Sequence, residues 1–160
     1  MRRTARVARE LVVMGGGGHA KVLVSVLKKC GYRVRGYTDR EDRGSILGAP
    51  YLGKDDILTG IVKKCAQAIV GVGKIDASPL RLRLQRKMES LGFEFPVICS
   101  PHAVVNEEVS LGAGAVVFDG VVISSGASIG RACIINTSST VEHDCRIGEN
   151  VHIAPGATLG

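Results

Sequence analysis

Aromatic side chains are scarce in this sequence, which has no tryptophan and only 4% Phe, Trp and Tyr among its 160 residues. Long apolar segments are also missing, because no run approaches the roughly 18 residues that a membrane-spanning helix needs. The basic first ten residues are followed by only four apolar residues before a run of glycines, too few for a signal peptide. We therefore expect a cytoplasmic protein that does not associate with membranes.

The five cysteines form no recognisable site. They are scattered, their number is odd, and none are paired in a CxxC motif. Such cysteines in a cytosolic protein are typical of small buried residues rather than of a disulfide set or a metal site. We expect no metal at these positions, which are Cys30, Cys65, Cys99, Cys133 and Cys145.

Hydrophobic residues make up 45% of the chain and charged residues 22%, which excludes a disordered protein. Residues 1–100 carry a net charge of +10, whereas residues 101–160 carry −4. This asymmetry predicts two functional regions, of which the basic one favours an anionic ligand, either a nucleotide or a nucleic acid. A simple solvated surface remains an alternative for individual basic residues. Because no aromatics are interleaved with the basic residues, we expect no nucleic-acid partner.

The first hundred residues show the alternation of a small parallel α/β unit. Residues 11–14, 33–38 and 68–72 are predicted strands. Residues 22–30 are a predicted helix that Gly31 ends, and Ser78-Pro79 is predicted to start a second one. The apolar residues predicted to face the core are Val22, Leu23, Val26, Leu27 and Cys30 in the first helix and Leu80, Leu84, Met88 and Leu91 in the second.

Four glycines join the first strand to the first helix. The pattern Gly15-x-Gly17-x-x-Ala20 matches the dinucleotide fingerprint, in which glycines let the backbone approach a phosphate at a helix N-terminus. Asp39 follows the second strand, where an acid that binds ribose would lie. The pattern predicts a phosphorylated, nucleotide-like ligand without establishing NAD. His19 is placed to contact that ligand, with capping of the helix as the alternative.

The last sixty residues follow a repeat of six. Six of the eight sixth positions between residues 114 and 156 are Gly, Asp or Asn, which tolerate a left-handed backbone at tight corners. Three hexads therefore close an 18-residue coil, and the repeat predicts a parallel β-helix. All ten third positions, predicted to stack inside it, are branched aliphatic residues: Val105, Leu111, Val117, Ile123, Ile129, Ile135, Val141, Ile147, Ile153 and Leu159.

These hexads resemble the left-handed β-helix of the hexapeptide-repeat acyltransferases. Together with residues 16–21, 71–73 and 136–145, they resemble the sugar acyltransferase subfamily, which includes sialic acid O-acetyltransferases and nucleotide-amino-sugar N-acetyltransferases. The resemblance covers residues 11–160. It implies an acetyl group moved from acetyl-CoA to an amino or hydroxyl group of a nucleotide-linked sugar.

His143 occupies the fifth place of its hexad, on a corner that points to solvent. An imidazole titrates near neutrality and can accept a proton from an amine or hydroxyl that attacks a thioester. Asp144, or less favourably Glu142, can orient the ring and stabilise its charged form. In the family, the histidine that matches His143 is the general base, and the acid after it raises its basicity.

The resemblance also implies other site residues and an assembly. Those implied at the sugar nucleotide are Gly17, Gly18, His19, Asp39 and Gly73, with Arg40 as a weaker candidate, and His152 is implied near acetyl-CoA. The residues 73–76 and Arg40 depart from the pattern of many relatives, so the sugar stays open. His143 and His152 fall on different faces of one coil, which a homotrimer with active sites between subunits would reconcile.

We therefore expect a basic tail at residues 1–10, a Rossmann-like domain at residues 11–100 and a left-handed β-helix at residues 101–160. The last hexad stops at Gly160, and we expect the sequence to be part of a longer enzyme whose further coils complete the acetyl-CoA site. Two alternatives stay open. One is a nucleotide-sugar-binding or scaffold protein without turnover, and the other is a hexapeptide acyltransferase with a different acyl donor or acceptor.

Overall fold

The structure is a computed structural model that describes residues 9–74 and 76–160. Apart from residues 9 and 10, which begin the first strand, the basic tail expected at residues 1–10 lies outside the described residues. In the described part of the chain, no helix has both the length and the apolar character needed to cross a membrane.

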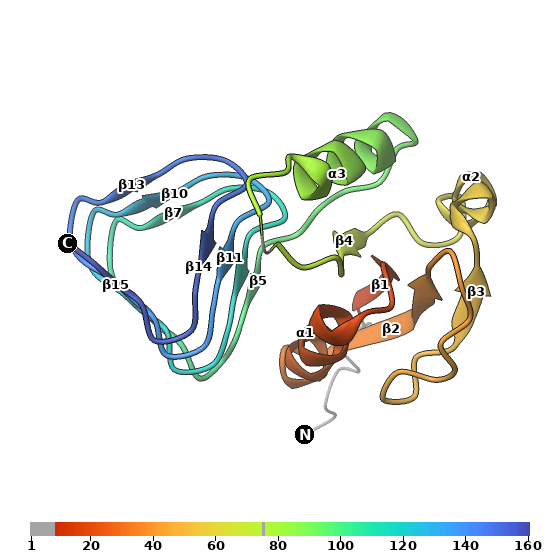
Figure 1. The fold of residues 1–160 in the computed structure, drawn as a ribbon, viewed down its shortest axis with the longest axis horizontal. Helices are drawn as coiled ribbons and strands as arrows, with labels where there is room; N and C mark the ends of the chain where they lie inside the picture. The colour runs from red at the N-terminus through yellow and green to blue at the C-terminus, as the bar shows by residue number, and fades with distance from the viewer. Residues whose placement is uncertain (1–8, 75) are drawn as a thin grey trace, which may run out of the picture.

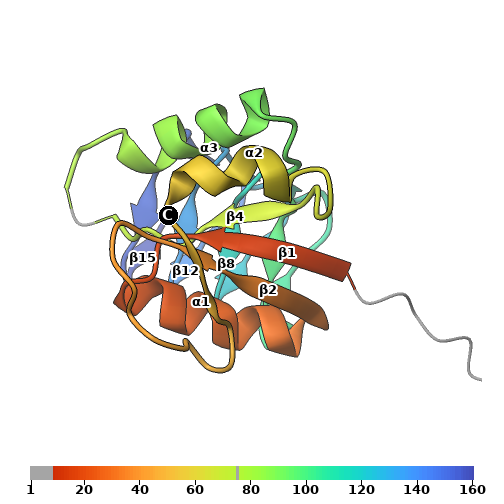
Figure 2. The same cartoon turned by 90° about the vertical axis from the view of Figure 1, so that its right-hand side faces the viewer.

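The first unit is a parallel sheet in the order β3-β2-β1-β4. The three predicted strands are confirmed as β1 (Arg9–Met14), β2 (Tyr32–Thr38) and β4 (Ala68–Val70). The sequence did not predict β3 (Tyr51–Gly53) or the two short helices η1 (Asp55–Ile57) and α2 (Leu58–Ile61). Figure 2 shows α1 (Gly18–Lys29) on one side of this sheet and α2 with α3 (Leu80–Ser90) on the other.

The two predicted helices are present, but their buried faces differ from the prediction. In α1 the predicted Val22 is 48% exposed, whereas Val24 is buried. In α3 the predicted Met88 is buried, and Leu84 and Leu91 are partly buried against the core, but the predicted Leu80 is 42% exposed. Three further residues of α3 that were not predicted to face the core are buried, namely Arg81, Leu82 and Gln85. The reason is that α3 packs against corners of the second unit, whose backbone carbonyls require N–H donors rather than apolar side chains.

The second unit is a parallel β-helix (Figure 1), as the hexads predicted. Each strand pairs with the strand 18 residues away, so three ladders run along the coil: β13-β10-β7, β14-β11-β8-β5 and β15-β12-β9-β6. The ladders begin at β5, just before residue 100. The strands are β5 (Ile98–Cys99), β6 (Val104–Val105), β7 (Ser110–Leu111), β8 (Val116–Val117), β9 (Val122–Ile123), β10 (Ser128–Ile129), β11 (Ile134–Ile135), β12 (Thr140–Val141), β13 (Arg146–Ile147), β14 (His152–Ile153) and β15 (Thr158–Leu159).

The corners between these strands confirm the predicted left-handed backbone. All eight sixth positions have a positive φ, including Ala132 at 55° and Ser138 at 57°, which are not residue types that favour it. Inside the coil, the third-position aliphatic residues from Val117 to Ile153 pack in one hydrophobic cluster with small side chains such as Ala115 and Cys133. The coil is therefore filled by side chains and has no hollow core.

The two units share an interface along one face of the coil. Ile98, Val116 and Ile134 point outward from β5, β8 and β11, and all three belong to the hydrophobic core of the α/β unit. Phe118 joins them. The next residue of this outward row is His152 on β14, so the row brings a polar side chain to the edge of the interface.

Candidate active site

Three glycines fix the backbone at the carboxyl ends of β1 and β4. Gly15 has a φ of +104°, and its N–H donates to the carbonyl oxygen of Thr38 at 2.7 Å. A Cβ atom at Gly16 would lie 2.4 Å from the ring of Tyr37, and one at Gly71 would lie 2.5 Å from Val13. These glycines are therefore needed for packing and conformation.

Gly17 and Gly18 have a different role. Gly17 has a φ of −78°, which any residue can adopt, and a Cβ atom at either position would meet nothing within 4 Å. Their lack of side chains leaves the N-terminal N–H groups of α1 open to a ligand. The first turn of α1 itself has no acidic residue, which favours an anionic ligand at the positive end of the helix dipole.

These glycines border the glycine cleft, a cavity of about 510 Å³ lined by residues 15–19, by Asp39 and by side chains between Gly71 and Arg81. This cleft is lined by most of the residues that were predicted to bind the sugar nucleotide, namely Gly17, Gly18, His19, Asp39 and Gly73. The predicted Arg40 lines a neighbouring leucine pocket of about 260 Å³, whose apolar walls are Met14, Val72, Leu80 and Leu84. Leu80 borders both cavities, which explains why it is not in the core.

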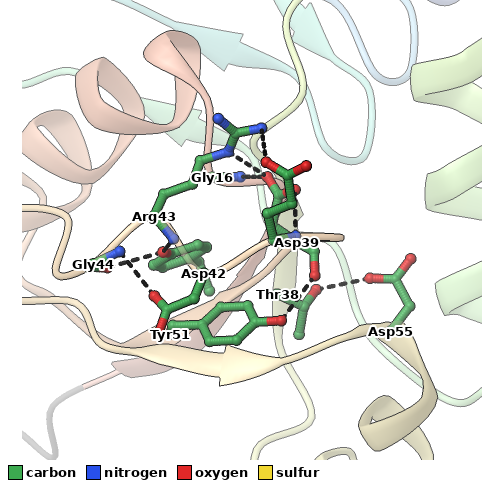
Figure 3. A network of polar contacts seen from close by, with 10 residues as sticks. Gly16, Thr38, Asp39, Asp42, Arg43, Gly44, Tyr51 and Asp55 are labelled. Atoms are coloured by element: carbon green, nitrogen blue, oxygen red, sulfur yellow. Dashed lines mark hydrogen bonds and ion pairs between the residues drawn. The ribbon is translucent and has the colours of Figure 1, made fainter.

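Asp39 holds the glycine turn in place (Figure 3). Its Oδ2 accepts a hydrogen bond from the Gly16 N–H at 2.7 Å and from Arg43 Nε at 3.4 Å, and its Oδ1 accepts from the Glu41 N–H at 3.4 Å. Partial burial opposes ionisation of Asp39, but these N–H groups and the charge of Arg43 outweigh it and lower the pKa of the carboxyl. A carboxylate therefore lies at the end of β2, where a ribose hydroxyl would need an acceptor.

His19 lies between the two units. Its ring meets Phe118 edge-on, with ring centroids 5.6 Å apart and an interplanar angle of 84°. Gly17 is the residue before the helix and no side chain caps it, so His19 does not act as the cap. Burial, and then the charge of Arg81 and the nearby His152 ring, lower the pKa of His19 to about 3. The ring is therefore neutral near pH 7, and its Nε2 has no partner among the described residues.

His152 joins the loop after β4 to the coil. A carbonyl oxygen can only accept, so His152 Nδ1 donates to the Lys74 carbonyl oxygen at 2.6 Å, which leaves Nε2 to accept from Asn136 Nδ2 at 2.9 Å. This pair of contacts selects the neutral tautomer with the proton on Nδ1. Asn136 and Lys74 were not predicted as site residues. Asn136 stands in the segment 136–145, and the 18-residue period pairs His152 with Ile134, two residues before Asn136, which was a partial signal for it.

His143 and Asp144 lie on the corner between β12 and β13, as predicted. His143 Nδ1 donates to Asp144 Oδ2 at 2.9 Å, and the two side chains are 77% and 80% exposed. This hydrogen bond, the charge of Asp144 and the weaker charge of Glu142 raise the pKa of His143. The hydrogen bond leaves Nε2 as the basic atom. Neither residue lines the glycine cleft, so a single chain does not bring the predicted base to the predicted nucleotide site.

No group of three His, Cys, Asp or Glu side chains within residues 9–74 and 76–160 is close enough to hold a metal ion. The five cysteines are unpaired.

Comparisons with known proteins identify both units. Residues 10–88 match the model of the PglD N-terminal domain, and residues 126–160 match the model of the bacterial transferase hexapeptide with six repeats. Comparison with curated proteins gives no match.

Several solved structures share this arrangement. One is GDP-perosamine N-acetyltransferase from Caulobacter crescentus, solved with CoA and GDP-perosamine as a mutant of one histidine, which is 36% identical with a TM-score of 0.89 over 94% of this chain and 70% of its own. Another is the acetyltransferase domain of PglB from Neisseria gonorrhoeae, solved with acetyl coenzyme A, which is 32% identical with a TM-score of 0.87 over 96% of this chain and 74% of its own. WeeI from Acinetobacter baumannii, at 24% identity and a TM-score of 0.76, shows a similar fold.

One assignment follows from the α/β unit, from the hexapeptide coil docked against it and from the sequence identity with these enzymes over most of their length. The chain belongs to the hexapeptide-repeat sugar acyltransferase family, in the group that contains nucleotide-sugar N-acetyltransferases.

Proposed function

We propose that this protein is an acetyltransferase that moves an acetyl group from acetyl-CoA to an amino or hydroxyl group of a nucleotide-linked sugar. The observation that carries the proposal is the glycine cleft, whose open helix N-terminus fits a diphosphate in a chain of this family. The N-acetyltransferase activity of the related GDP-perosamine N-acetyltransferase supports an amino group as the acceptor.

The nucleotide would lie across both cavities. The diphosphate lies over Gly17 and Gly18 at the start of α1, and the ribose hydroxyls bind Asp39. The base enters the leucine pocket, where Leu80 and Leu84 provide an apolar wall and Arg40 a polar edge. The α/β unit at residues 11–100 thus binds the acceptor, and the β-helix at residues 101–160 supplies the chemistry.

His143 acts as the general base of the reaction. Its Nε2 takes the proton from the attacking sugar nitrogen as the new C–N bond forms at the thioester carbonyl, and the proton then passes to the leaving thiolate as the C–S bond breaks. Asp144 accepts a hydrogen bond from the Nδ1–H group, fixes the ring orientation and stabilises the imidazolium that forms. Glu142, the less favoured orienting acid, adds only negative charge nearby.

His152 would lie near acetyl-CoA, the co-substrate, and no metal is required. It borders a cavity of about 510 Å³ together with Lys74, Asp76 and Asn150. Both of its ring nitrogens are occupied by Lys74 and Asn136, so His152 contributes a fixed neutral ring rather than a second base.

The protein would act as a homotrimer. His143 lies outside the cleft of its own chain, so a neighbouring subunit is needed to bring this base to an acceptor. The outer face of β6 offers surface for association, since Val104 is 53% exposed there. The five unpaired cysteines support a cytoplasmic location, and we propose no membrane or nucleic-acid partner.

Calorimetric titration with GDP-, UDP- and CMP-linked sugars, followed by an acetyl-transfer assay with each that binds, tests this function. Binding of one nucleotide sugar together with release of thiol from acetyl-CoA supports it. Binding without transfer favours a binding or scaffold protein, and transfer only with another donor or acceptor favours the other hexapeptide acyltransferase. Failure of every nucleotide sugar to bind contradicts the assignment of the cleft.

A further inference from the structure

Arg81 is a buried cation on α3 that the sequence did not single out. It is only 1% exposed. Its Nε donates to the Ala132 carbonyl oxygen at 3.0 Å, and its Nη1 donates to the carbonyl oxygens of Val70 and Val72, both at 2.7 Å. Arg81 therefore ties the end of β4 and the turn that follows it to a corner of the coil.

These contacts satisfy the Nε and Nη1 donors of Arg81, but the backbone carbonyl oxygens carry no net negative charge to balance the guanidinium. No carboxylate within the described residues forms an ion pair with Arg81, and its Nη2 has no hydrogen-bond partner there. Burial lowers the pKa of Arg81 to about 10, so the guanidinium is still charged at neutral pH. Burying a charge without a counter-charge is costly, and such a group requires a reason to be retained.

The position of Arg81 supplies that reason. It lines the glycine cleft, and the carbonyl groups it binds flank Gly71, which lines the same cleft. Other charged side chains there are Asp39, held by N–H groups and Arg43, and Lys74 and Asp76 in the loop after β4. The cleft therefore combines the positive end of α1 with a fixed cation in its wall, an arrangement that favours a multiply charged anion.

We propose that Arg81 is the counter-charge for the diphosphate of the nucleotide sugar. Through its hydrogen bonds to the carbonyl oxygens of Val70 and Val72, it also fixes the backbone of the cleft wall that contacts the ligand. The inference rests on the proposed function and adds a positioning residue to it. Because Nη2 is not accessible, Arg81 acts across the cleft wall, by its charge and by the carbonyl groups it holds, rather than by direct contact.

The test compares a nucleoside diphosphate with its nucleoside. GDP and UDP are titrated by calorimetry and guanosine and uridine by NMR, for the wild-type chain and for Arg81→Met, Arg81→Lys and Arg83→Met. Arg83 lies two residues further along α3 and is exposed, so it is the matched control for loss of one positive charge. The nucleotide that the wild type binds more tightly is used for the variants.

We expect Arg81→Met to lose about tenfold or more in diphosphate affinity while nucleoside affinity changes less than about twofold. Arg81→Lys keeps the charge but cannot bridge all three carbonyls, so we expect it to recover most of the diphosphate affinity at a lower melting temperature. Arg83→Met should match the wild type. Unchanged diphosphate affinity in Arg81→Met, or an equal loss of nucleoside and diphosphate affinity, would overturn the inference.

A measurement on the wild-type chain decides the case if the variants do not fold. A buried charge is poorly screened, so the ratio of diphosphate to nucleoside affinity should persist at about 1 M NaCl, where the Debye length is about 3 Å. A ratio that collapses to about one there would overturn the inference. If the wild type binds no nucleoside diphosphate at any salt concentration, the proposed function fails as well, whereas binding that is indifferent to Arg81 refutes this inference alone.

Discussion

Acid should destabilise this protein through His19, and the size of the effect follows from its surroundings. The ring is packed against Phe118 at the junction of the two units, with the Arg81 charge nearby. Protonation would add a second charge to a site that already lacks a counter-charge. The pKa of His19 is therefore lowered from 6.5 to about 3 in the folded chain.

Proton linkage gives the sign and magnitude of the change in the free energy of unfolding with pH. Between these two pKa values the unfolded chain binds a proton at His19 that the folded chain does not, so the contribution is fully present above pH 6.5 and is lost as the pH falls toward 3. The slope is half its full value at pH 6.5, where half of the unfolded chains are protonated at His19, and it rises to about 1.4 kcal/mol per pH unit below that. The loss between pH 6.5 and about pH 4.5 therefore amounts to about 2 kcal/mol.

The assay is urea unfolding followed by circular dichroism at several pH values, because the chain has no tryptophan for fluorescence. His19→Gln keeps a neutral polar side chain and cannot take up the proton. We expect its free energy of unfolding to fall less steeply with acid than that of the wild type, by about 1.4 kcal/mol per pH unit in this interval. His102→Gln, at an exposed position, controls for the loss of one histidine. Parallel curves for wild type and His19→Gln would refute the reasoning.

Three further predictions concern binding and catalysis. Gly17→Ala should keep the free energy of unfolding within about 0.5 kcal/mol of the wild-type value, because φ is −78° and no atom lies near the added methyl group. It should nevertheless weaken nucleotide-sugar binding about tenfold in calorimetry, because the methyl group covers the start of α1. Leu80→Ala, at a 42% exposed position, should likewise keep the fold and weaken nucleotide binding about threefold to tenfold by calorimetry. Asp144→Asn should move the acidic limb of the kcat/KM profile to lower pH, because Asp144 raises the pKa of His143 and activity falls as the pH drops through that value.

Each of these has a matched control. Gly60→Ala adds the same methyl group at an open position of α2 and should not affect binding. Val22→Ala removes an exposed apolar side chain, like Leu80→Ala, but on α1. Glu142→Gln should move the acidic limb in the same direction by less than Asp144→Asn. Unchanged affinity for the first two variants, or an unmoved limb for the third, would contradict the respective account.

The coil could be predicted from the sequence because its physics is local and periodic. A two-residue strand and a corner recur every six residues, so each aliphatic third position faces the same interior. The left-handed corners at Ala132 and Ser138 show that the period imposes the backbone even where the residue type does not favour it. The glycine turn was predictable for a similar reason, since Gly17 and Gly18 follow a strand and precede a helix.

The junction of the two units could not be predicted in this way. The stripe on α3 suggested that Leu80 faces a core, but the coil presents backbone carbonyls there, and Arg81 and Gln85 turn toward them instead. No local pattern shows which side of a helix will meet unpaired carbonyls. The contact of His152 with Lys74 likewise joins segments 78 residues apart and depends on how the two units dock.

The central claim is that His143 is the base of an acetyl transfer to a nucleotide-linked sugar. It is tested most directly by thiol release from acetyl-CoA for wild type and His143→Asn, with the nucleotide sugar that binds and with His102→Asn as the matched histidine control. The account predicts turnover by the wild type and the control, and a rate lower by about 10² to 10⁴ for His143→Asn at unchanged nucleotide-sugar affinity. Equal rates for the wild type and His143→Asn would contradict it.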